Sequence, residues 1–212
     1  MLSEWIGKLG KMLLNALVSV LGRAGINPNF LTLLGFLINI VAAYYLYRGQ
    51  FVKAGWIILA AGAMDMLDGA VAKKTQTTSE FGAFFDSVID RYSDIALYLG
   101  LIVYYGKCNR MDYVDLVGIC IMGSMMTSYA RARAECLIPQ CHVGFLERPE
   151  RVVLLILGAW FGRMEQVLWV IAILSNWTVI SRIIFTYKEL PRASFMPRFR
   201  STDNRPLPPE GE

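Results

Sequence analysis

Six long apolar stretches, separated by short polar turns, dominate this chain of 212 residues. A stretch of about 20 apolar residues is what an α-helix needs to cross the hydrocarbon core of a bilayer. Lipid offers no partner for backbone polar groups, so only helices or closed barrels span a membrane. The sequence therefore predicts an all-α, polytopic membrane protein with six transmembrane helices, at about 30–47, 52–72, 80–105, 113–134, 149–162 and 167–187.

The composition agrees with this fold class, since 55% of the residues are hydrophobic, only 18% are charged and the mean hydropathy is +0.43. Residues 1–24 carry apolar side chains at helical spacing with basic residues between them, which predicts an amphipathic helix in the membrane interface. Residues 191–212 are polar and contain several prolines, so we expect a partly disordered cytoplasmic tail. The predicted organisation is one membrane domain over 1–190, with its spans within 30–187, followed by this tail.

The basic residues between the spans predict the orientation of the protein. Most of them, including Lys73, Arg131 and Lys188, fall on the side that also holds both termini. Loops rich in Lys and Arg face the cytoplasm in membrane proteins. We therefore expect an integral membrane protein in which the end of the second span and the start of the third lie at the cytoplasmic headgroup level.

Four aspartates lie where the second and third spans meet this side. Asp65 and Asp68 are three residues apart and Asp86 and Asp90 are four apart, so each pair shares one face of a helix. An ionised Asp inside a bilayer costs about 2.5–3.5 kcal/mol on insertion scales, and hard cations bind carboxylate oxygens. The array predicts a site for two divalent ions, Mg²⁺ or Mn²⁺, that bind a diphosphate. The competing interpretation is that the four residues cap helices and contact solvent.

The array resembles the signature of the CDP-alcohol phosphotransferase family, D-x-x-D-G-x-x-A-R followed after eight residues by G-x-x-x-D-x-x-x-D. The matching positions are Asp65, Asp68, Gly69, Ala72, Gly82, Asp86 and Asp90. Lys73 stands where the family has Arg, which keeps the charge but loses the bidentate fork for phosphate. The resemblance implies transfer of a phosphatidyl-type group from a CDP-lipid to an alcohol, with release of CMP, in a prokaryotic cell membrane.

The resemblance also implies roles for individual residues. Asp90 would serve as a general base as well as a ligand, beside the metal ligands Asp65, Asp68 and Asp86. The segment from Asn27 to Thr32 resembles the family's P-N-x-L-T segment, although it is equally an ordinary helix start. The residues implied to bind the CDP-lipid are Asn29, Thr32, Asp68, Gly69, Ala72, Lys73 and Gly82. A homodimer is expected from the resemblance alone, and no nucleic-acid partner is expected.

Basic residues of the later spans form a second constellation. Arg131, Arg133, Arg148 and Arg151 all lie on the expected cytoplasmic side, and Arg182 lies within an apolar span near that side, where it needs an anion. Basic residues at span ends are also common as orientation signals or headgroup contacts. Taken together, these residues predict a pocket for the phosphate of a phosphorylated acceptor alcohol.

The segments S-Y-x-[KR]-A-R-A-E and E-R-P-E-R, with Arg182, resemble one branch of the family, the phosphatidylinositol-phosphate synthases and their archaeal ether-lipid counterparts. This implies inositol 1-phosphate as the acceptor, held by Arg131, Arg151 and Arg182 with Arg133 in support. Glycerol 3-phosphate stays open because it also carries a phosphate, and the lipid is either diacylglycerol or its ether analogue. A membrane cation transporter is the alternative of another class, but the internal repeats and mid-membrane acids expected of one are not found.

Overall fold

The structure is a computed structural model and describes residues 27–190. Within that range the chain forms six α-helices and no strand. The helices are α2 (Pro28–Tyr47), α3 (Phe51–Lys74), α4 (Glu80–Lys107), α5 (Met111–Glu135), α6 (Arg148–Trp160) and α7 (Met164–Glu189). Each predicted segment matches one helix, which confirms the all-α class. The expected interfacial helix at 1–24 and the tail at 191–212 lie outside the described residues.

Four helices of the described range are long and apolar enough to cross a membrane, namely α2, α3, α5 and α7. The chain is therefore a polytopic membrane protein with four candidate spans. Helix α4 has 28 residues but carries the charged side chains Asp86, Asp90, Arg91 and Asp94. Helix α6 has 13 residues, fewer than the roughly 20 that a perpendicular span requires. That α4 and α6 also cross the bilayer stays a prediction.

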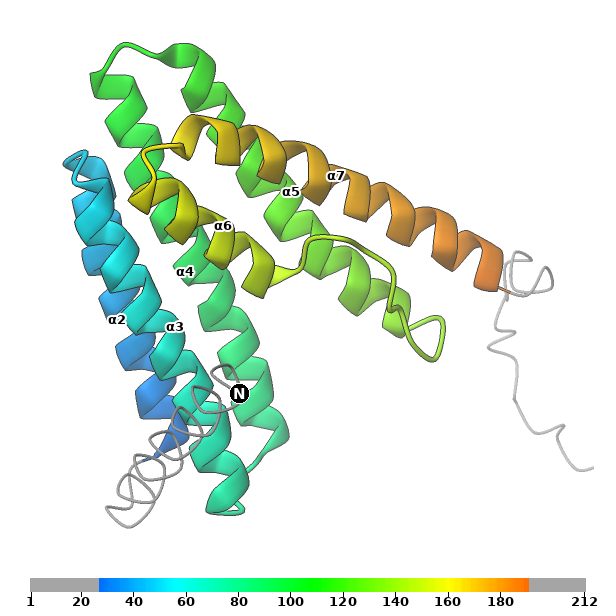
Figure 1. Ribbon diagram of the computed structural model, residues 1–212. Coiled ribbons are helices and arrows are strands. Elements are labelled where there is room, and N and C mark those ends of the chain that lie inside the picture. The colour runs from blue at the N-terminus through cyan, green and yellow to red at the C-terminus, as the bar shows by residue number, and fades with distance from the viewer. Residues whose placement is uncertain (1–26, 191–212) are drawn as a thin grey trace, which may run out of the picture.

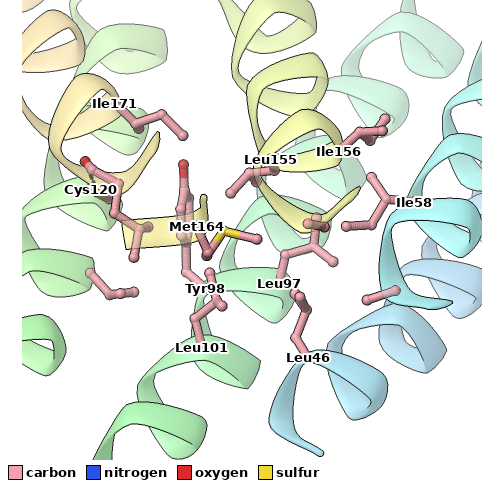
Figure 2. Close-up of a cluster of buried hydrophobic side chains, with 14 of the residues drawn as sticks. Leu46, Ile58, Leu97, Tyr98, Leu101, Cys120, Leu155, Ile156, Met164 and Ile171 are labelled. Atoms are coloured by element: carbon pink, nitrogen blue, oxygen red, sulfur yellow. Dashed lines mark hydrogen bonds between the residues drawn. The ribbon is translucent and has the colours of Figure 1, made fainter. Parts of the chain in front are cut away.

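The helices form two groups that α6 connects (Figure 1). Helix α2 packs against α3 and α4, whereas α5 packs against α7, and contacts between α4 and α5 join the groups. The short α6 contacts α3 on one side and α7 on the other. The main buried cluster lies at this junction, where Ile58 of α3, Leu97 of α4 and Leu155 of α6 are among the buried side chains (Figure 2). The packing therefore places the start of α6 beside the acidic parts of α3 and α4.

Close packing of α4 on α2 depends on a glycine. A Cβ on Gly100 would lie 2.4 Å from the carbonyl oxygen of Ala43, which is closer than any such contact can be. Small residues let membrane helices approach in this way. The approach holds the first half of the molecule together and fixes the position of α4, which carries Asp86 and Asp90.

Candidate active site

Two capped helix starts meet at one end of the first group. The side chain of Asn27 accepts a hydrogen bond from the backbone N–H of Asn29 at 3.0 Å, where α2 begins. The side chain of Ser79 accepts one from the backbone N–H of Gly82 at 2.9 Å, where α4 begins. A Cβ on Gly82 would lie 3.4 Å from the Asn29 side-chain oxygen, so the two helix starts are in close contact. Both caps fix where the chain enters its helix, beside α3.

Three carboxylates converge next to these helix starts. Asp65, Asp68 and Asp86 each bring one oxygen to within 4.8 Å of the others. We call these three residues the acid cluster. Asp68 is buried, and its Oδ2 accepts a hydrogen bond from Thr32 Oγ1 at 2.7 Å. Asp86 Oδ1 is buried and has no hydrogen-bond partner among the described residues.

This donor set fits a hard divalent cation. A buried carboxylate oxygen normally has a hydrogen-bond partner, so the unpartnered Asp86 Oδ1 calls for another ligand. Carboxylate oxygens from three residues are the ligands that Mg²⁺ and Mn²⁺ prefer. The residues present therefore fit the predicted metal, and the acid cluster accounts for three of its four predicted ligands.

The contact from Thr32 makes a testable contribution to this centre. Hydrogen bonds that orient metal ligands typically change metal affinity by about 10- to 100-fold when removed. Thr32→Val is therefore expected to weaken Mn²⁺ binding at least about tenfold, measured by electron paramagnetic resonance on the purified protein. Thr186→Val is the matched control, because the Thr186 hydroxyl bonds a carbonyl of its own helix, that of Arg182. Equal Mn²⁺ affinity of Thr32→Val and the wild type would show that Asp68 does not need this contact.

A hollow of about 230 Å³ opens beside the acid cluster, between the starts of α2 and α4 and the end of α3. All seven residues predicted to bind the CDP-lipid line it, and so does Asp86. A Cβ on Gly69 would meet no atom within 4 Å, so the backbone of α3 is open toward solvent or a ligand at this point. Lys73 is exposed here. The structure therefore brings these seven residues together, and their ligand stays a prediction.

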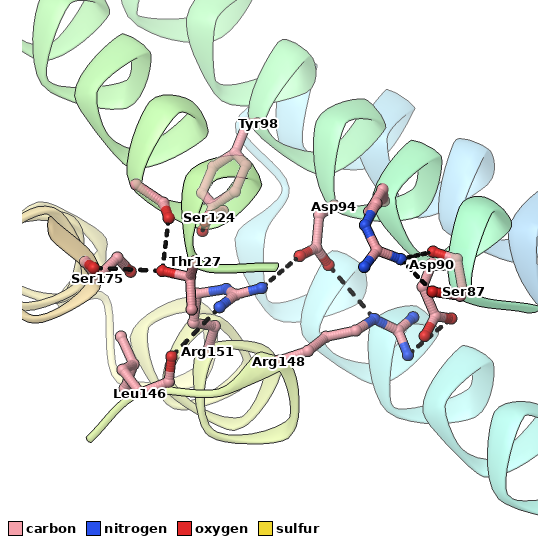
Figure 3. Close-up of polar contacts among 12 residues, drawn as sticks. Ser87, Asp90, Asp94, Tyr98, Ser124, Thr127, Leu146, Arg148, Arg151 and Ser175 are labelled. Carbon is pink, nitrogen blue, oxygen red and sulfur yellow. Dashed lines mark hydrogen bonds and ion pairs between the residues drawn. The ribbon is translucent and has the colours of Figure 1, made fainter. Parts of the chain in front are cut away.

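Asp90 does not join the acid cluster; it pairs with Arg148 at the start of α6 (Figure 3). Arg148 Nη1 lies 2.8 Å from Asp90 Oδ1 and 2.8 Å from Asp65 Oδ2. Its Nε lies 3.6 Å from Asp94 Oδ1, a distance for an ion pair but not for a hydrogen bond. Asp94 Oδ2 also accepts a hydrogen bond from Arg151 Nη2 at 3.0 Å. A chain of charges therefore runs from the acid cluster through Arg148 to Arg151.

The Asp94–Arg151 pair is a structural element that the sequence interpretation missed. The two side chains are 7% and 2% exposed, and they tie α4 to α6. Breaking such a buried pair from one side leaves an uncompensated charge and costs about 3–5 kcal/mol. Asp94 lies four residues after Asp90, on the same helix face, and this spacing was the available signal. Arg148 was among the basic residues of the predicted phosphate pocket, but its pairing with the aspartates was not predicted.

A second hollow, of about 320 Å³, lies on the other side of Arg148. We call it the basic hollow, and its charged lining residues are Arg91, Arg131, Glu135, Glu147, Arg148, Arg151 and Arg182. Three of the four arginines predicted to hold a phosphate thus come together, and Arg91 and Arg148 join them. Arg131 is the more accessible of the three, with 36% of its side chain exposed. It pairs with Glu135 at 3.1 Å and with Glu147 at 2.8 Å.

Arg133 does not line the basic hollow. It lies in a mainly apolar hollow between α5 and α7. Residues two apart on an α-helix point about 200° away from each other, so Arg131 and Arg133 face different sides of α5. The structure does not support its predicted place beside Arg131.

Arg182 finds its partners inside the protein. Its side chain is 2% exposed and donates to the carbonyl oxygens of Val143 at 2.9 Å and Thr127 at 2.6 Å, and to Glu147 at 3.1 Å. The Glu147 carboxylate is an anion of the kind that this buried charge was expected to need, and carbonyls of α5 and of the loop before α6 supply its other acceptors. That Arg182 also holds the acceptor phosphate stays a prediction. Arg182 joins α7 to both of these segments and closes the back of the basic hollow.

An apolar hollow of about 320 Å³ continues from the acid cluster between α2, α3, α4 and α6. Phe36, Ile58 and Val152 are among its apolar lining residues, and Asp90 and Arg148 stand at its polar end. Arg148 thus lines this hollow and the basic hollow alike. The arrangement can hold an apolar chain, a diphosphate and a second phosphate next to one another.

Comparisons with known proteins agree with this geometry. The archaetidylinositol phosphate synthase of Pyrococcus horikoshii is 39% identical over 182 residues, which cover 85% of this chain and 94% of that protein. The crystal structure of Mycobacterium tuberculosis phosphatidylinositol phosphate synthase with CDP-DAG bound gives a TM-score of 0.77 at 28% identity, covering 83% of this chain and 94% of that one. The structure of that synthase in complex with manganese and citrate gives a TM-score of 0.75 at 28% identity, covering 82% and 88%.

The family match spans most of the described residues. Residues 26–187 match the family described as CDP-alcohol phosphatidyltransferase, and this range includes the acid cluster and both polar hollows. The match decides against the transporter interpretation, because these residues are those of a transferase. With the signature aspartates in place and relatives that align over nearly their whole length, this chain belongs to the CDP-alcohol phosphatidyltransferase family.

Proposed function

We propose that this protein transfers a phosphatidyl-type group from a CDP-lipid to inositol 1-phosphate and releases CMP. The observation that carries the proposal is the position of Arg148 between the acid cluster and the basic hollow. A diphosphate and the phosphate of an acceptor can therefore lie next to each other. Relatives named for inositol phosphate products support this acceptor.

The donor half is assigned to α2, α3 and α4. The hollow lined by Asn29, Gly69 and Lys73 takes the cytidine diphosphate, and the apolar hollow takes an acyl or alkyl chain of the same molecule. Two divalent ions, Mg²⁺ or Mn²⁺, would be held by the acid cluster and would neutralise charge on the diphosphate and on the departing CMP. Gly82 lies where the starts of α2 and α4 meet, since a Cβ there would lie 3.4 Å from the Asn29 side-chain oxygen.

The transfer itself needs one proton acceptor. The acceptor hydroxyl oxygen forms a bond to the phosphorus that carries the lipid, and the bond from that phosphorus to the bridging oxygen of CMP breaks. CMP leaves with the bridging oxygen, and the hydroxyl proton passes to the carboxylate of Asp90. Arg148 holds that carboxylate at the boundary between the donor half and the basic hollow. Asp90 is therefore assigned as the general base.

Acceptor choice tests the proposal directly. Purified protein with a CDP-lipid is expected to release CMP fastest with inositol 1-phosphate, more slowly with glycerol 3-phosphate, and poorly with free inositol or serine. The reason is that the basic hollow holds a phosphate, which the last two compounds lack. Faster turnover with free inositol would refute the phosphate pocket, whereas faster turnover with glycerol 3-phosphate would change only the product. Running the same panel with diacyl and ether CDP-lipids identifies the donor.

Arg131 is the side chain best suited to a mutational test of the acceptor. Charge-assisted contacts contribute roughly 1.5–3 kcal/mol each, so Arg131→Ala is expected to raise the KM for inositol 1-phosphate about 10- to 100-fold. The KM for the CDP-lipid should stay the same. Arg133→Ala is the comparison on the other face of α5, and its KM should change less than twofold. A large effect of Arg133→Ala with none for Arg131→Ala would reverse this assignment.

Two further properties are proposed on the family resemblance. The active site faces the cytoplasm of a prokaryotic cell, where water-soluble acceptors are available and into which CMP can be released. The protein forms a homodimer, and cross-linking in native membranes that gives monomer alone would contradict it. Neither property is needed for the transfer step described above.

A further inference from the structure

Arg148 contacts two sites that bind opposite charges. One nitrogen, Nη1, lies 2.8 Å from a carboxylate oxygen of Asp65 and 2.8 Å from one of Asp90. The same residue lines the basic hollow, together with Arg131 and Arg182. Within residues 27–190, Arg148 is the basic side chain that forms an ion pair with a member of the acid cluster. Its side chain is largely buried, so water screens these interactions only weakly.

The charge of Asp65 is shared between Arg148 and the acid cluster. Asp65 offers a carboxylate oxygen to the point where Asp68 and Asp86 also converge, and its Oδ2 contacts Arg148. A divalent cation at that point attracts the Asp65 carboxylate, which then neutralises less of the Arg148 charge. The cation and the guanidinium also repel each other, because both are positive and share one carboxylate.

Three other arginines of the basic hollow are already paired with carboxylates, Arg131 and Arg182 with glutamates and Arg151 with Asp94, and Arg91 donates to Ser87 of its own helix. Glu147 Oε1 lies 2.8 Å from Arg131 and 3.1 Å from Arg182, and Glu135 lies 3.1 Å from Arg131. These carboxylates oppose the binding of an anion. The positive charge that changes with the state of the acid cluster is therefore that of Arg148. When a cation binds at the acid cluster, an anion in the basic hollow would therefore be attracted by more of the Arg148 charge.

We propose that Arg148 is a positioning residue that couples divalent-cation binding at the acid cluster to phosphate binding in the basic hollow. The identification of that phosphate with the acceptor rests on the proposed function. With this coupling, the acceptor is held tightly only after the donor half carries its cation. Arg148 also keeps Asp90 at the boundary between the two halves, since both of these contacts come from one guanidinium nitrogen.

Coupling between two sites is reciprocal and is typically 5- to 150-fold in affinity. The Kd of inositol 1-phosphate, and that of glycerol 3-phosphate, would be measured by titration calorimetry with and without saturating Mn²⁺. We expect the wild type to bind at least one of these esters about tenfold more tightly when Mn²⁺ is present. The Kd of Mn²⁺, measured by electron paramagnetic resonance, should fall by the same factor when that ester is saturating.

The decisive variant is Arg148→Gln. For this variant, the ratio of the Kd of the phosphate ester without Mn²⁺ to its Kd with Mn²⁺ should fall to within about twofold of one. A matched control is Arg131→Gln, which removes an arginine of the same hollow that does not contact the acid cluster. It should weaken phosphate binding but keep the tenfold ratio. Direct attraction between cation and phosphate would survive in Arg148→Gln, so an unchanged ratio in that variant overturns the proposal. A wild type without coupling to either ester overturns it equally.

Arg148→Lys is a second variant that tests the proposal if Arg148→Gln does not fold. Lysine keeps the charge, but its single ammonium group cannot reach Asp65, Asp90 and Asp94 as the guanidinium does. The expected ratio is less than half that of the wild type, and an unchanged ratio counts against the coupling role. These titrations involve no turnover, so they separate the two proposals. Coupling without CMP release from inositol 1-phosphate would refute the proposed acceptor only, whereas CMP release with an unchanged ratio in Arg148→Gln would refute the role of Arg148.

Discussion

Asp90→Asn is expected to lower the rate of CMP release by about 100- to 10,000-fold, the usual contribution of a positioned general base. The affinity for the CDP-lipid should change little. Asn keeps the size of the side chain and can still accept a hydrogen bond from Arg148, but it cannot take up the acceptor's proton. The acid cluster, built from Asp65, Asp68 and Asp86, does not depend on Asp90 for its geometry. Single-turnover assays and CDP-lipid binding on the same preparation measure both quantities.

The control for Asp90→Asn is Asp112→Asn. Asp112 also pairs with an arginine, Arg110 at 3.4 Å, but it is exposed at the start of α5. Its turnover should equal that of the wild type. If Asp90→Asn lost CDP-lipid binding and Mn²⁺ binding together with turnover, Asp90 would be primarily a metal ligand, as the signature alone allows. Turnover near the wild-type rate would refute the general-base role.

Removal of divalent ions is expected to abolish CMP release completely, and Mg²⁺ or Mn²⁺ should restore it. Three convergent carboxylates repel one another without a cation, and no ion pair with Asp68 or Asp86 occurs within residues 27–190. Addition of Mn²⁺ to chelator-treated protein should also raise the Tm, because a ligand that binds the folded state stabilises it. This second readout does not depend on turnover.

Asp86→Asn sharpens the same prediction. It alters the carboxylate whose Oδ1 is buried and without a hydrogen-bond partner in the described structure, so it should remove most of the rise in Tm with Mn²⁺. Asp112→Asn should show the full rise. The Mn²⁺ stoichiometry, measured in the same titration, distinguishes one ion from the two that we propose. Full activity of the chelator-treated protein would contradict a metal-dependent mechanism.

The positions of the helices and of the acid cluster could be predicted from the sequence, because both depend on local geometry. Apolar stretches of membrane-spanning length dictate helices, since lipid leaves backbone groups no other partners. The spacing between Asp65 and Asp68 places both side chains on one face in any α-helix. Asp86 and Asp90 likewise share one face of the next helix, which follows α3 after a short loop. The seven residues predicted to bind the CDP-lipid lie on these two helices and on the adjacent start of α2.

Only the tertiary structure decided which charges meet across the chain. Arg148 and Asp65 are 83 residues apart, and Arg151 and Asp94 are 57 apart, so no local pattern relates them. They meet because the short α6 packs between α3 and α7 and directs its first turn at the acidic face of α4. Arg182 likewise meets acceptors that no local pattern shows, namely the carbonyl oxygens of Thr127 and Val143 and the carboxylate of Glu147. Local spacing therefore determined which aspartates form the acid cluster, and the packing of α6 determined which arginines meet the aspartates and how the two halves of the site are connected.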